Sequence, residues 1–139
     1  MKFEKSCGAV VYRKIDENLE FLAVKSKLSN RWGFAKGHVE FEETEKETAK
    51  REVLEEAGIN INIHDGFRMK IDYNINENIK KEVIFFLAEL SEKPATIDYK
   101  EIHEYKWDNF ENMLTLLTYN NQKEISKEAY SFLQHKGHN

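Results

Sequence analysis

Residues 37–59 read GHVEFEETEKETAKREVLEEAGI and contain the strongest structural signal in the chain. Glu43–Ala57 is predicted to form a helix, because its apolar residues recur with helical spacing. Ala49, Val53 and Ala57 lie four residues apart and form one stripe on the helix surface. This stripe predicts a helix that packs one side against a hydrophobic core.

Both ends of the predicted helix carry recognisable boundary signals. Thr44 followed by Glu47 has the spacing of a capping box at a helix N-terminus. Gly58 fits the left-handed position that commonly ends a helix. Gly37 lies just upstream, where the backbone must turn tightly. Loop, helix and closing turn therefore form one rigid unit.

Three glutamates of this helix suggest a metal site. Glu52, Glu55 and Glu56 are spaced i, i+3 and i+4, so their side chains share one face and repel one another. A hard divalent cation such as Mg²⁺ relieves that repulsion, because it prefers carboxylate oxygens and keeps water ligands that phosphate can replace. Arg51 is one turn from Glu47 and Glu55 and can orient the cluster. The competing interpretation is an exposed glutamate-rich helix face, which is common in surface helices.

The rest of the chain alternates apolar and polar segments. The segments predicted to be strands are Ser6–Tyr12, Leu19–Lys25, Trp32–Phe34, Ile59–Ile63, Phe67–Tyr73, Glu82–Leu90 and Glu101–Trp107. Residues 13–18 and 74–81 are predicted to be polar connections within hairpins. Two further helices are predicted, Phe110–Leu117 and Glu124–Leu133. The order of elements predicts an α/β (α+β) fold with a mixed β-sheet sandwiched between helices.

Composition limits the class of protein. A chain of 139 residues with 40% hydrophobic residues suits a single domain spanning residues 1–139. The single cysteine, Cys7, excludes an internal disulfide and is expected to lie in a buried strand. No apolar run is long enough to span a membrane, and the first residues lack a signal-peptide pattern. We therefore expect a cytoplasmic protein that does not engage membranes.

The charge balance argues against a long nucleic acid as partner. The formal net charge is -4 and the isoelectric point is about 5.8. The acidic residues are concentrated near the predicted helix, which again points to a cationic ligand there. We expect a small-molecule nucleotide as partner, not DNA, and a monomer or weak dimer.

The helix and its flanks match a known signature in full. The fixed positions of the Nudix box are filled by Gly37, Glu43, Arg51-Glu52, Glu55-Glu56 and Gly58, with apolar residues at the required places. The chain thus resembles the Nudix hydrolases. The resemblance implies hydrolysis of a nucleoside diphosphate linked to another group, with Mg²⁺ or Mn²⁺ as cofactor. It assigns the metal to Glu52, Glu55 and Glu56, an orienting role to Arg51, and a supporting role to Glu43.

The flanks are similar to one subgroup, the asymmetrical diadenosine tetraphosphate hydrolases. The similar segments are Trp32–Glu40, Gly66-Phe67 with Tyr73, Lys80–Ala88, and Glu101 with Tyr105 and Trp107. Phe34-Ala35 departs from the proline-containing pair that is usual in this subgroup. The subgroup resemblance implies cleavage of diadenosine tetraphosphate to ATP and AMP.

Basic side chains beside the box are candidate phosphate contacts. Lys36, Lys80 and Lys81 are assigned this role, with solvated surface lysines as the alternative for the last two. His38 is a candidate phosphate donor or proton-transfer group, because histidine titrates near neutral pH. A loop histidine bonded to the backbone is the alternative.

Aromatic and acidic residues complete the candidate site. Tyr73 is the first candidate for stacking on adenine and Tyr119 the second, with core packing as the alternative. Glu101 matches an acidic position of the subgroup and is a candidate for a second metal or for the general base. Gly37 is grouped with Glu101 in the wider metal site. The general base stays open between Glu101, His38 and a box glutamate.

Two other functions compete with this one. RNA 5′-pyrophosphohydrolases share the box, so a triphosphorylated RNA 5′ end is an alternative substrate, although the acidic charge balance weighs against it. A nucleotide-binding module without catalysis is the third interpretation. It is disfavoured because degenerate relatives normally lose box glutamates or the arginine, and none is missing here.

Overall fold

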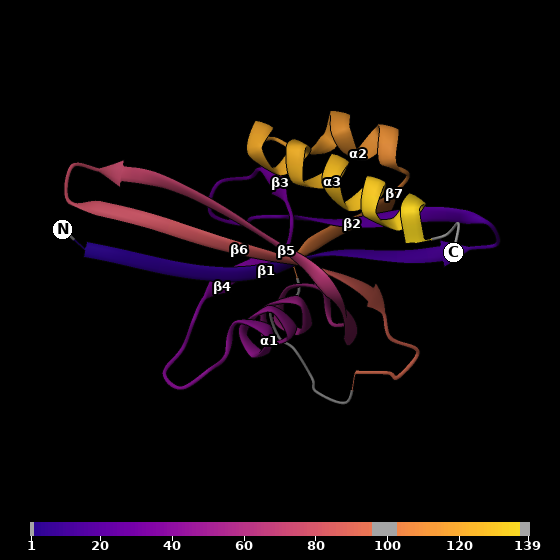
Figure 1. Cartoon of the computed structure of the whole chain (residues 1–139), viewed down its shortest axis with the longest axis horizontal. Helices are drawn as coiled ribbons and strands as arrows, with labels where there is room; N and C mark the ends of the chain where they lie inside the picture. Colours follow the sequence, from indigo (N-terminus) through magenta and orange to yellow (C-terminus); the bar gives the residue numbers. More distant parts are fainter. Residues whose placement is uncertain (1, 96–102, 137–139) are drawn as a thin grey trace.

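The computed structural model describes residues 2–95 and 103–136. Its strands are β1 (Lys2–Ile15), β2 (Asn18–Lys25), β3 (Trp32–Gly33), β4 (Lys36–His38), β5 (Ile61–Asn76), β6 (Ile79–Leu90) and β7 (Glu104–Asp108). Its helices are α1 (Glu45–Ala57), α2 (Phe110–Leu116) and α3 (Asn120–Lys136). The sheet lies between α1 on one face and α2 with α3 on the other (Figure 1). The mixed sheet between helices that the sequence predicts is confirmed.

The sheet is built around β1. Its main order is β3-β2-β1-β6-β5, and β4 pairs with β1 while β7 pairs with β2. The pair β1–β6 is parallel, with Cys7 opposite Ile84, and the other pairs are antiparallel. Cys7 is fully buried there, as expected of a small apolar residue in a central strand.

Each face of the sheet buries its own set of apolar side chains. On the side of α1, Ala49, Val53 and Ala57 pack against the sheet, so the predicted stripe is the buried side of the helix. On the other side, the core includes Met113 of α2 and Ile125 of α3. The opposite faces of β1 and β6 contribute to both cores because successive strand residues point to opposite faces.

Helix α1 begins two residues later than its apolar pattern predicts. Thr44 has an extended backbone and accepts a hydrogen bond from the Glu47 N–H, while the Glu47 side chain accepts from the Thr44 N–H. This is the predicted capping box, and it leaves Glu43 in the preceding turn. Gly58 ends the helix in the left-handed conformation with φ of 70°.

Several strands are longer than the sequence indicates. The predicted strand Ile59–Ile63 starts two residues later, at Ile61, and forms one strand, β5, with Phe67–Tyr73, because pairing with β6 resumes after a bulge between Ile63 and Arg68. Gly66, with φ of 90°, lies in that bulge. The polar connections at 13–18 and 74–81 shrink to tight turns, and their other residues extend the strands. Alternation fails to reveal these extensions because the strand ends are largely exposed and even apolar residues there, such as Ile15 and Ile75, are not buried.

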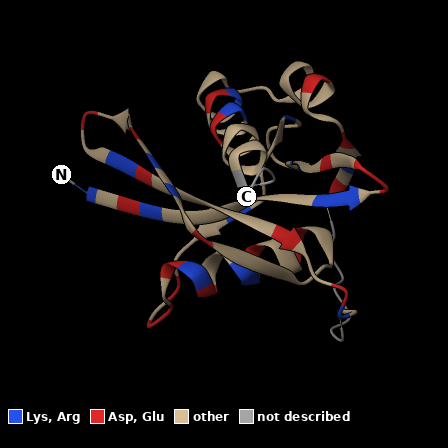
Figure 2. Ribbon diagram, turned by 45° about the vertical axis from the view of Figure 1, so that its right-hand side comes forward, with Lys and Arg blue, Asp and Glu red and all other residues tan. Residues whose placement is uncertain are grey.

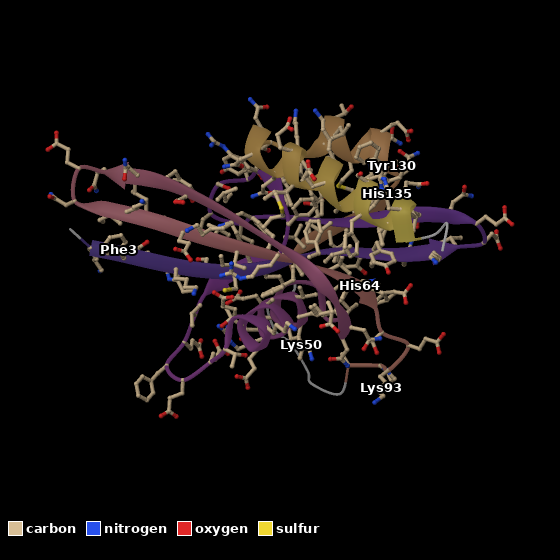
Figure 3. The ribbon with its side chains drawn as sticks, in the orientation of Figure 1. Phe3, Lys50, His64, Lys93, Tyr130 and His135 are labelled. Atoms are coloured by element: carbon tan, nitrogen blue, oxygen red, sulfur yellow. The ribbon has the colours of Figure 1, made fainter. Side chains whose placement is uncertain are left out.

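The extra length of these strands forms an arm. The ends of β1, β5 and β6 project beyond the helical layers (Figure 1), and Phe3 lies near the tip (Figure 3). Basic and acidic segments alternate along this arm, whereas the loop that precedes α1 is predominantly acidic (Figure 2). The arm therefore adds a surface of mixed charge to the sheet.

Helix α3 starts at Asn120, four residues before the apolar pattern begins. Its first turn is polar, and that polarity hides it from a search for apolar periodicity. Across residues 2–95 and 103–136, no helix combines the length and apolar character needed to cross a membrane. Glu101, the predicted start of the last strand, lies outside the described residues.

Candidate active site

The site begins where β4 passes α1. Pairing of Lys36 with Gly8 and of His38 with Ser6 holds β4 against β1. Gly37 then faces the helix so closely that a Cβ there would lie 2.1 Å from the carboxyl carbon of Glu52. Only glycine leaves room for this carboxylate beside the strand, so the first box glycine is required sterically.

Glu52 and Glu56 place two carboxylates together at this point. Their side chains are only 14% and 12% exposed. The Lys36 N–H donates to Oε2 of Glu56 at 3.0 Å. Burial, followed by the charge and a hydrogen bond of Glu52, raises the pKa of Glu56 well above its usual range. The pair is therefore held in a position where its full negative charge is unfavourable.

Arg51 is the main counter-charge to the acidic helix. Its Nε donates to Oε2 of Glu43 at 2.7 Å, and its Nη1 donates to Oε1 of Glu52 at 2.8 Å. Its Nη2 donates to the carbonyl of His38 at 2.9 Å. Glu55, which is 47% exposed, is turned toward Nη1 at 3.2 Å. One guanidinium thus ties α1 to the loop and to β4.

Glu43 fixes the loop that leads into α1. Besides the bonds from Arg51, its Oε1 accepts from the Thr48 hydroxyl and from the Glu40 N–H, both at 2.9 Å. The hydrogen bonds of Arg51, supported by those of Glu40 and Thr48, lower the pKa of Glu43 to about 2. Glu43 is therefore occupied by protein donors and supports the site from behind.

The acidic pair fits a divalent cation. Two neighbouring carboxylates with so little solvent exposure offer hard oxygen donors to a cation, and the cation stabilises their negative charge. Within the described part of the chain, no three acidic or histidine side chains converge on one point, because Glu55 is engaged by Arg51. Glu101 lies outside that part. Glu52 and Glu56 are thus the residues that can hold Mg²⁺ or Mn²⁺, with water completing the coordination.

Two lysines bring positive charge to the same place. Lys36 is largely buried, and this burial lowers its pKa against the opposing effects of Glu56 and Glu52. Burial, and then the nearby charge of Lys36, lowers the pKa of Lys81. Lys80 points to the opposite face of β6 from Lys81, because successive strand residues alternate between faces. Its Nζ lies 3.9 Å from a carboxylate oxygen of Asp72. Lys36 and Lys81 thus influence each other electrostatically, whereas Lys80 pairs with Asp72.

His38 contributes to the site through its backbone. Its carbonyl accepts from Arg51, while its side chain is 64% exposed. The Nε2 atom lies 3.9 Å from a carboxylate oxygen of Glu4. The imidazole therefore stands at the surface beside the site, on the side of Lys81 and Glu4.

Tyr73 and Tyr119 lie within electrostatic range of each other although they are 46 positions apart in the sequence. Tyr73 forms a row with Lys81 and Glu4 across β5, β6 and β1. Burial raises the pKa of Tyr73, and the charge of Tyr119 is the next contributor, so the two phenol groups interact electrostatically. Both rings keep substantial exposure, at 41% and 39%. Core packing does not account for them.

A pocket of about 240 Å³ adjoins the acidic pair. Its lining residues come from β2, the following loop, β3, β4, α1 and the segments around β7 and α3. They are Val24, Ser26, Ser29, Arg31, Gly33, Phe34, Lys36, Glu56, His103, Tyr119 and Gln122. The pocket therefore connects Glu56, one of the predicted metal ligands, with Tyr119.

Three residues of this pocket have no signal in the sequence. The His103 N–H donates to the Glu56 carbonyl at 2.8 Å, and its Nδ1 lies 3.6 Å from Oε1 of Glu56. The guanidinium of Arg31 lies 5.9 Å from the centre of the Tyr119 ring. Gln122 is buried in the first turn of α3. Each belongs to a different segment, and only folding brings them together.

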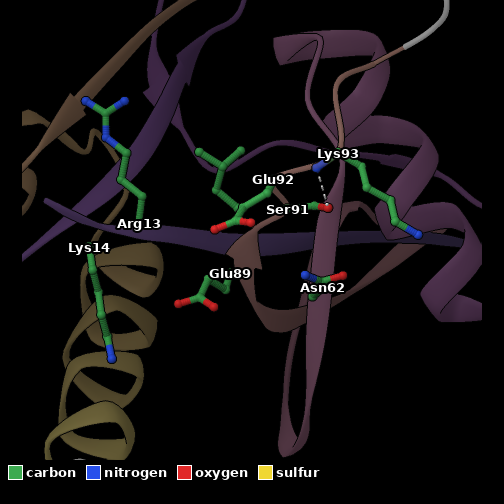
Figure 4. A pocket seen from close by; sticks show the side chains of 8 residues that line it. Arg13, Lys14, Asn62, Glu89, Ser91, Glu92 and Lys93 are labelled. Carbon is green, nitrogen blue, oxygen red and sulfur yellow. Dashed lines mark hydrogen bonds between the residues drawn. The ribbon is translucent and has the colours of Figure 1, made fainter.

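A larger hollow of about 570 Å³ lies elsewhere, at the ends of β1 and β6 (Figure 4). Arg13, Lys14, Glu89 and Lys93 line it together with four other residues, and the Lys93 N–H donates to Ser91 Oγ at 3.2 Å. None of its lining residues belongs to the box or to the predicted phosphate contacts. We therefore place the chemistry in the smaller pocket.

Known proteins resemble the whole of this arrangement. A model of the NUDIX domain matches residues 3–129. The bis(5′-nucleosyl)-tetraphosphatase (asymmetrical) of Sus scrofa is 31% identical over 140 residues, covering 93% of this chain and 95% of that protein. The likeness thus includes the strands and helices outside the box.

Solved structures agree with the sequence relatives. The crystal structure of the Caenorhabditis elegans Ap4A hydrolase aligns with a TM-score of 0.79 at 29% identity, covering 96% of this chain and 99% of that one. The NUDIX domain of Shewanella oneidensis NrtR, complexed with ADP ribose, aligns with a TM-score of 0.70 at 15% identity. The second likeness supports the fold alone.

Replacing Gly37 by alanine tests the close approach of β4 and Glu52. We expect Gly37→Ala to weaken binding of Mg²⁺ or Mn²⁺ roughly 10- to 100-fold, because the new Cβ displaces a carboxylate that must stay in place. Isothermal titration calorimetry measures the affinity, and circular dichroism checks that the fold is retained. An unchanged affinity in a folded variant would show that Glu52 does not hold the cation.

Proposed function

The chain belongs to the NUDIX family as a pyrophosphohydrolase, and we propose that its substrate is diadenosine tetraphosphate, cleaved to ATP and AMP. The proposal rests on one structural observation. Glu56 of the acidic pair, Lys36 and Tyr119 line a single pocket, and Lys36 and Tyr119 lie within electrostatic range of Lys81 and Tyr73. The likeness to asymmetrical tetraphosphatases over 93% of the chain supports the choice of substrate.

Glu52 and Glu56 are proposed to hold Mg²⁺ or Mn²⁺, with Glu55 joining them when it leaves Arg51. When bound, such a cation neutralises charge that develops on phosphoryl oxygens and lowers the pKa of water. Arg51 keeps Glu52 in position by a direct hydrogen bond of 2.8 Å. Gly37 gives the carboxylate its space. Glu101 remains a candidate for a second metal or for the general base.

Lys36 and Lys81 are proposed to bind the phosphate chain. Lys36 is influenced by Glu56 and Glu52 and in turn influences Lys81, so the two positive charges can follow a polyanionic bridge away from the acidic pair. The lowered pKa of each lysine reflects burial, and a bound phosphate restores the preference for the charged form. His38, at the exposed side of this group, can donate to an outer phosphate.

Glu56 is proposed to accept a proton from the attacking water. Glu56 lines the pocket, and position within reach of the water is the first requirement for a general base. Oε2 is held by the Lys36 N–H, so Oε1, which faces His103, is the atom available for the proton.

Tyr73 and Tyr119 are proposed to bind an adenine base. Two neighbouring aromatic rings with exposed surface offer faces on which a base can stack. The row of Tyr73, Lys81 and Glu4 leads from the arm toward the pocket, so base and phosphates bind along one path.

A substrate panel with product identification tests the proposed reaction. With Mg²⁺ present, we expect diadenosine tetraphosphate to yield ATP and AMP, and to be used in preference to triphosphorylated RNA, ADP-ribose and oxidised deoxynucleotides. The acidic net charge of -4 gives no electrostatic advantage to RNA. Chromatography of the products distinguishes the reactions. Preferred release of pyrophosphate from RNA would replace this proposal with the RNA alternative.

A pair of glutamate variants serves as control for that panel. Glu56→Gln removes a carboxylate of the acidic pair and is expected to lower kcat by at least about 100-fold. Glu111→Gln makes the same chemical change at an exposed position of α2 and should leave turnover unchanged. Equal activity of both variants would remove Glu56 from the reaction.

Tyr73→Ala tests base stacking. Loss of a stacking ring costs about 1–3 kcal/mol, so KM for the dinucleotide should rise roughly 5- to 150-fold. Tyr73→Phe retains the ring and should keep the wild-type KM. Phe3→Ala removes another exposed ring from the arm and is the matched control. If Tyr73→Phe loses as much as Tyr73→Ala, the hydroxyl is important and stacking is not.

A further inference from the structure

Gln122 presents one half of a buried amide to the pocket. Its residue surface is 3% exposed. The Phe34 N–H donates to its Oε1 at 2.9 Å. A backbone N–H can only donate, so the amide oxygen must face Phe34 and the nitrogen must point the other way. Chemistry therefore fixes the orientation of this side chain.

The packing around Gln122 keeps the amide in this orientation. Gly33 lies so close that a Cβ there would be 2.8 Å from Oε1 and 3.4 Å from Nε2. The β3 segment and the first turn of α3 thus enclose the side chain. A side chain held this firmly loses little entropy when it forms another hydrogen bond.

The amide nitrogen of Gln122 is available to a ligand. Among the described residues it has no hydrogen-bond partner, and it is not sealed from solvent as the hydroxyls of Ser6 and Ser126 are. Gln122 lines the 240 Å³ pocket that also contains Glu56 and Tyr119. A buried amide with one free half is costly unless a ligand or water accepts its hydrogens.

The neighbouring groups determine what kind of ligand fits. Lys36 and Arg31 are donors, and Arg31 lies near the face of Tyr119. Away from Glu56, the fixed charged and amide groups of the pocket therefore donate hydrogen bonds. A complementary ligand must combine a stacking surface with acceptor atoms, which is the chemistry of a nucleobase edge with its ring nitrogens or carbonyls.

We propose that Gln122 is a specificity-determining residue that donates from Nε2 to an acceptor atom on the nucleobase of the substrate. This inference deepens the proposed function, on which its choice of a nucleotide ligand rests. Lys36 and Lys81 would bind phosphate whatever group is attached to it. The neutral, immobile amide of Gln122 instead recognises an acceptor atom of the base. Gln122 thus separates nucleotides from base-free polyphosphates.

Two substitutions separate recognition from a structural role. Gln122→Glu keeps an oxygen for the Phe34 N–H and replaces the amide nitrogen that faces the pocket by a second oxygen, which also adds a negative charge. Gln122→Met removes both polar atoms at similar length. Asn121→Glu adds the same charge at the neighbouring exposed position of α3 and controls for electrostatics.

The readout is equilibrium binding of ATP and of inorganic tripolyphosphate in Mg²⁺, measured by calorimetry with thermal midpoints for each variant. We expect ATP to bind roughly tenfold more weakly to Gln122→Glu and to Gln122→Met. Tripolyphosphate should bind to them as to the wild type, and Asn121→Glu should bind both ligands normally. The thermal midpoints show whether each variant is folded at the temperature of the binding measurement.

Three results would overturn the inference. The first is unchanged ATP binding by Gln122→Glu, which would leave Gln122 as a structural clamp for Phe34. The second is an equal loss for ATP and tripolyphosphate, which would indicate charge repulsion. The third is a wild type that binds ATP no more tightly than tripolyphosphate. Failure of the proposed function is a separate result, because it is seen as absent turnover of diadenosine tetraphosphate by the wild type.

Discussion

Two carboxylates, those of Glu52 and Glu56, are held side by side with little access to water, and their repulsion organises the surrounding structure. Like charges at such positions are tolerated only where donors or cations compensate them. Arg51 compensates Glu52 from the helix, and the Lys36 N–H compensates Glu56 from β4. The negative charge that these donors do not compensate makes the pair suitable for a divalent cation.

The fold provides these compensating groups from parts of the chain that are rigid for other reasons. Strand β4 is fixed by pairing with the central strand β1, and α1 is fixed by its capping box and its buried stripe. The pocket beside them is closed by the first turn of α3, where Gln122 binds the Phe34 N–H. The proposed metal site, phosphate contacts and base recognition thus rest on elements with separate stabilisation, so changes in one need not disturb the others.

The sequence predicts the helical part of this site well and the rest poorly. Helix α1, its cap and its buried face are local properties, and spacing alone reveals Glu52 and Glu56 on a common side. The position of Glu55 depends on its hydrogen bond with Arg51, and helical spacing cannot show which carboxylates Arg51 binds. From the sequence, Lys80 and Lys81 are equally good candidates for binding phosphate. Only the register of β6 distinguishes them. Gln122 carries no signal, because its partner is a backbone group 88 positions away.

The central claim is that the Glu52–Glu56 pair binds a divalent cation. Crystals of the protein soaked in Mn²⁺ test it directly through the anomalous difference map. The account predicts a strong peak within coordinating distance of both carboxylates, at about 2.0–2.2 Å, beside Gly37. A map with no peak there, or with the metal bound only at other acidic side chains, would contradict it.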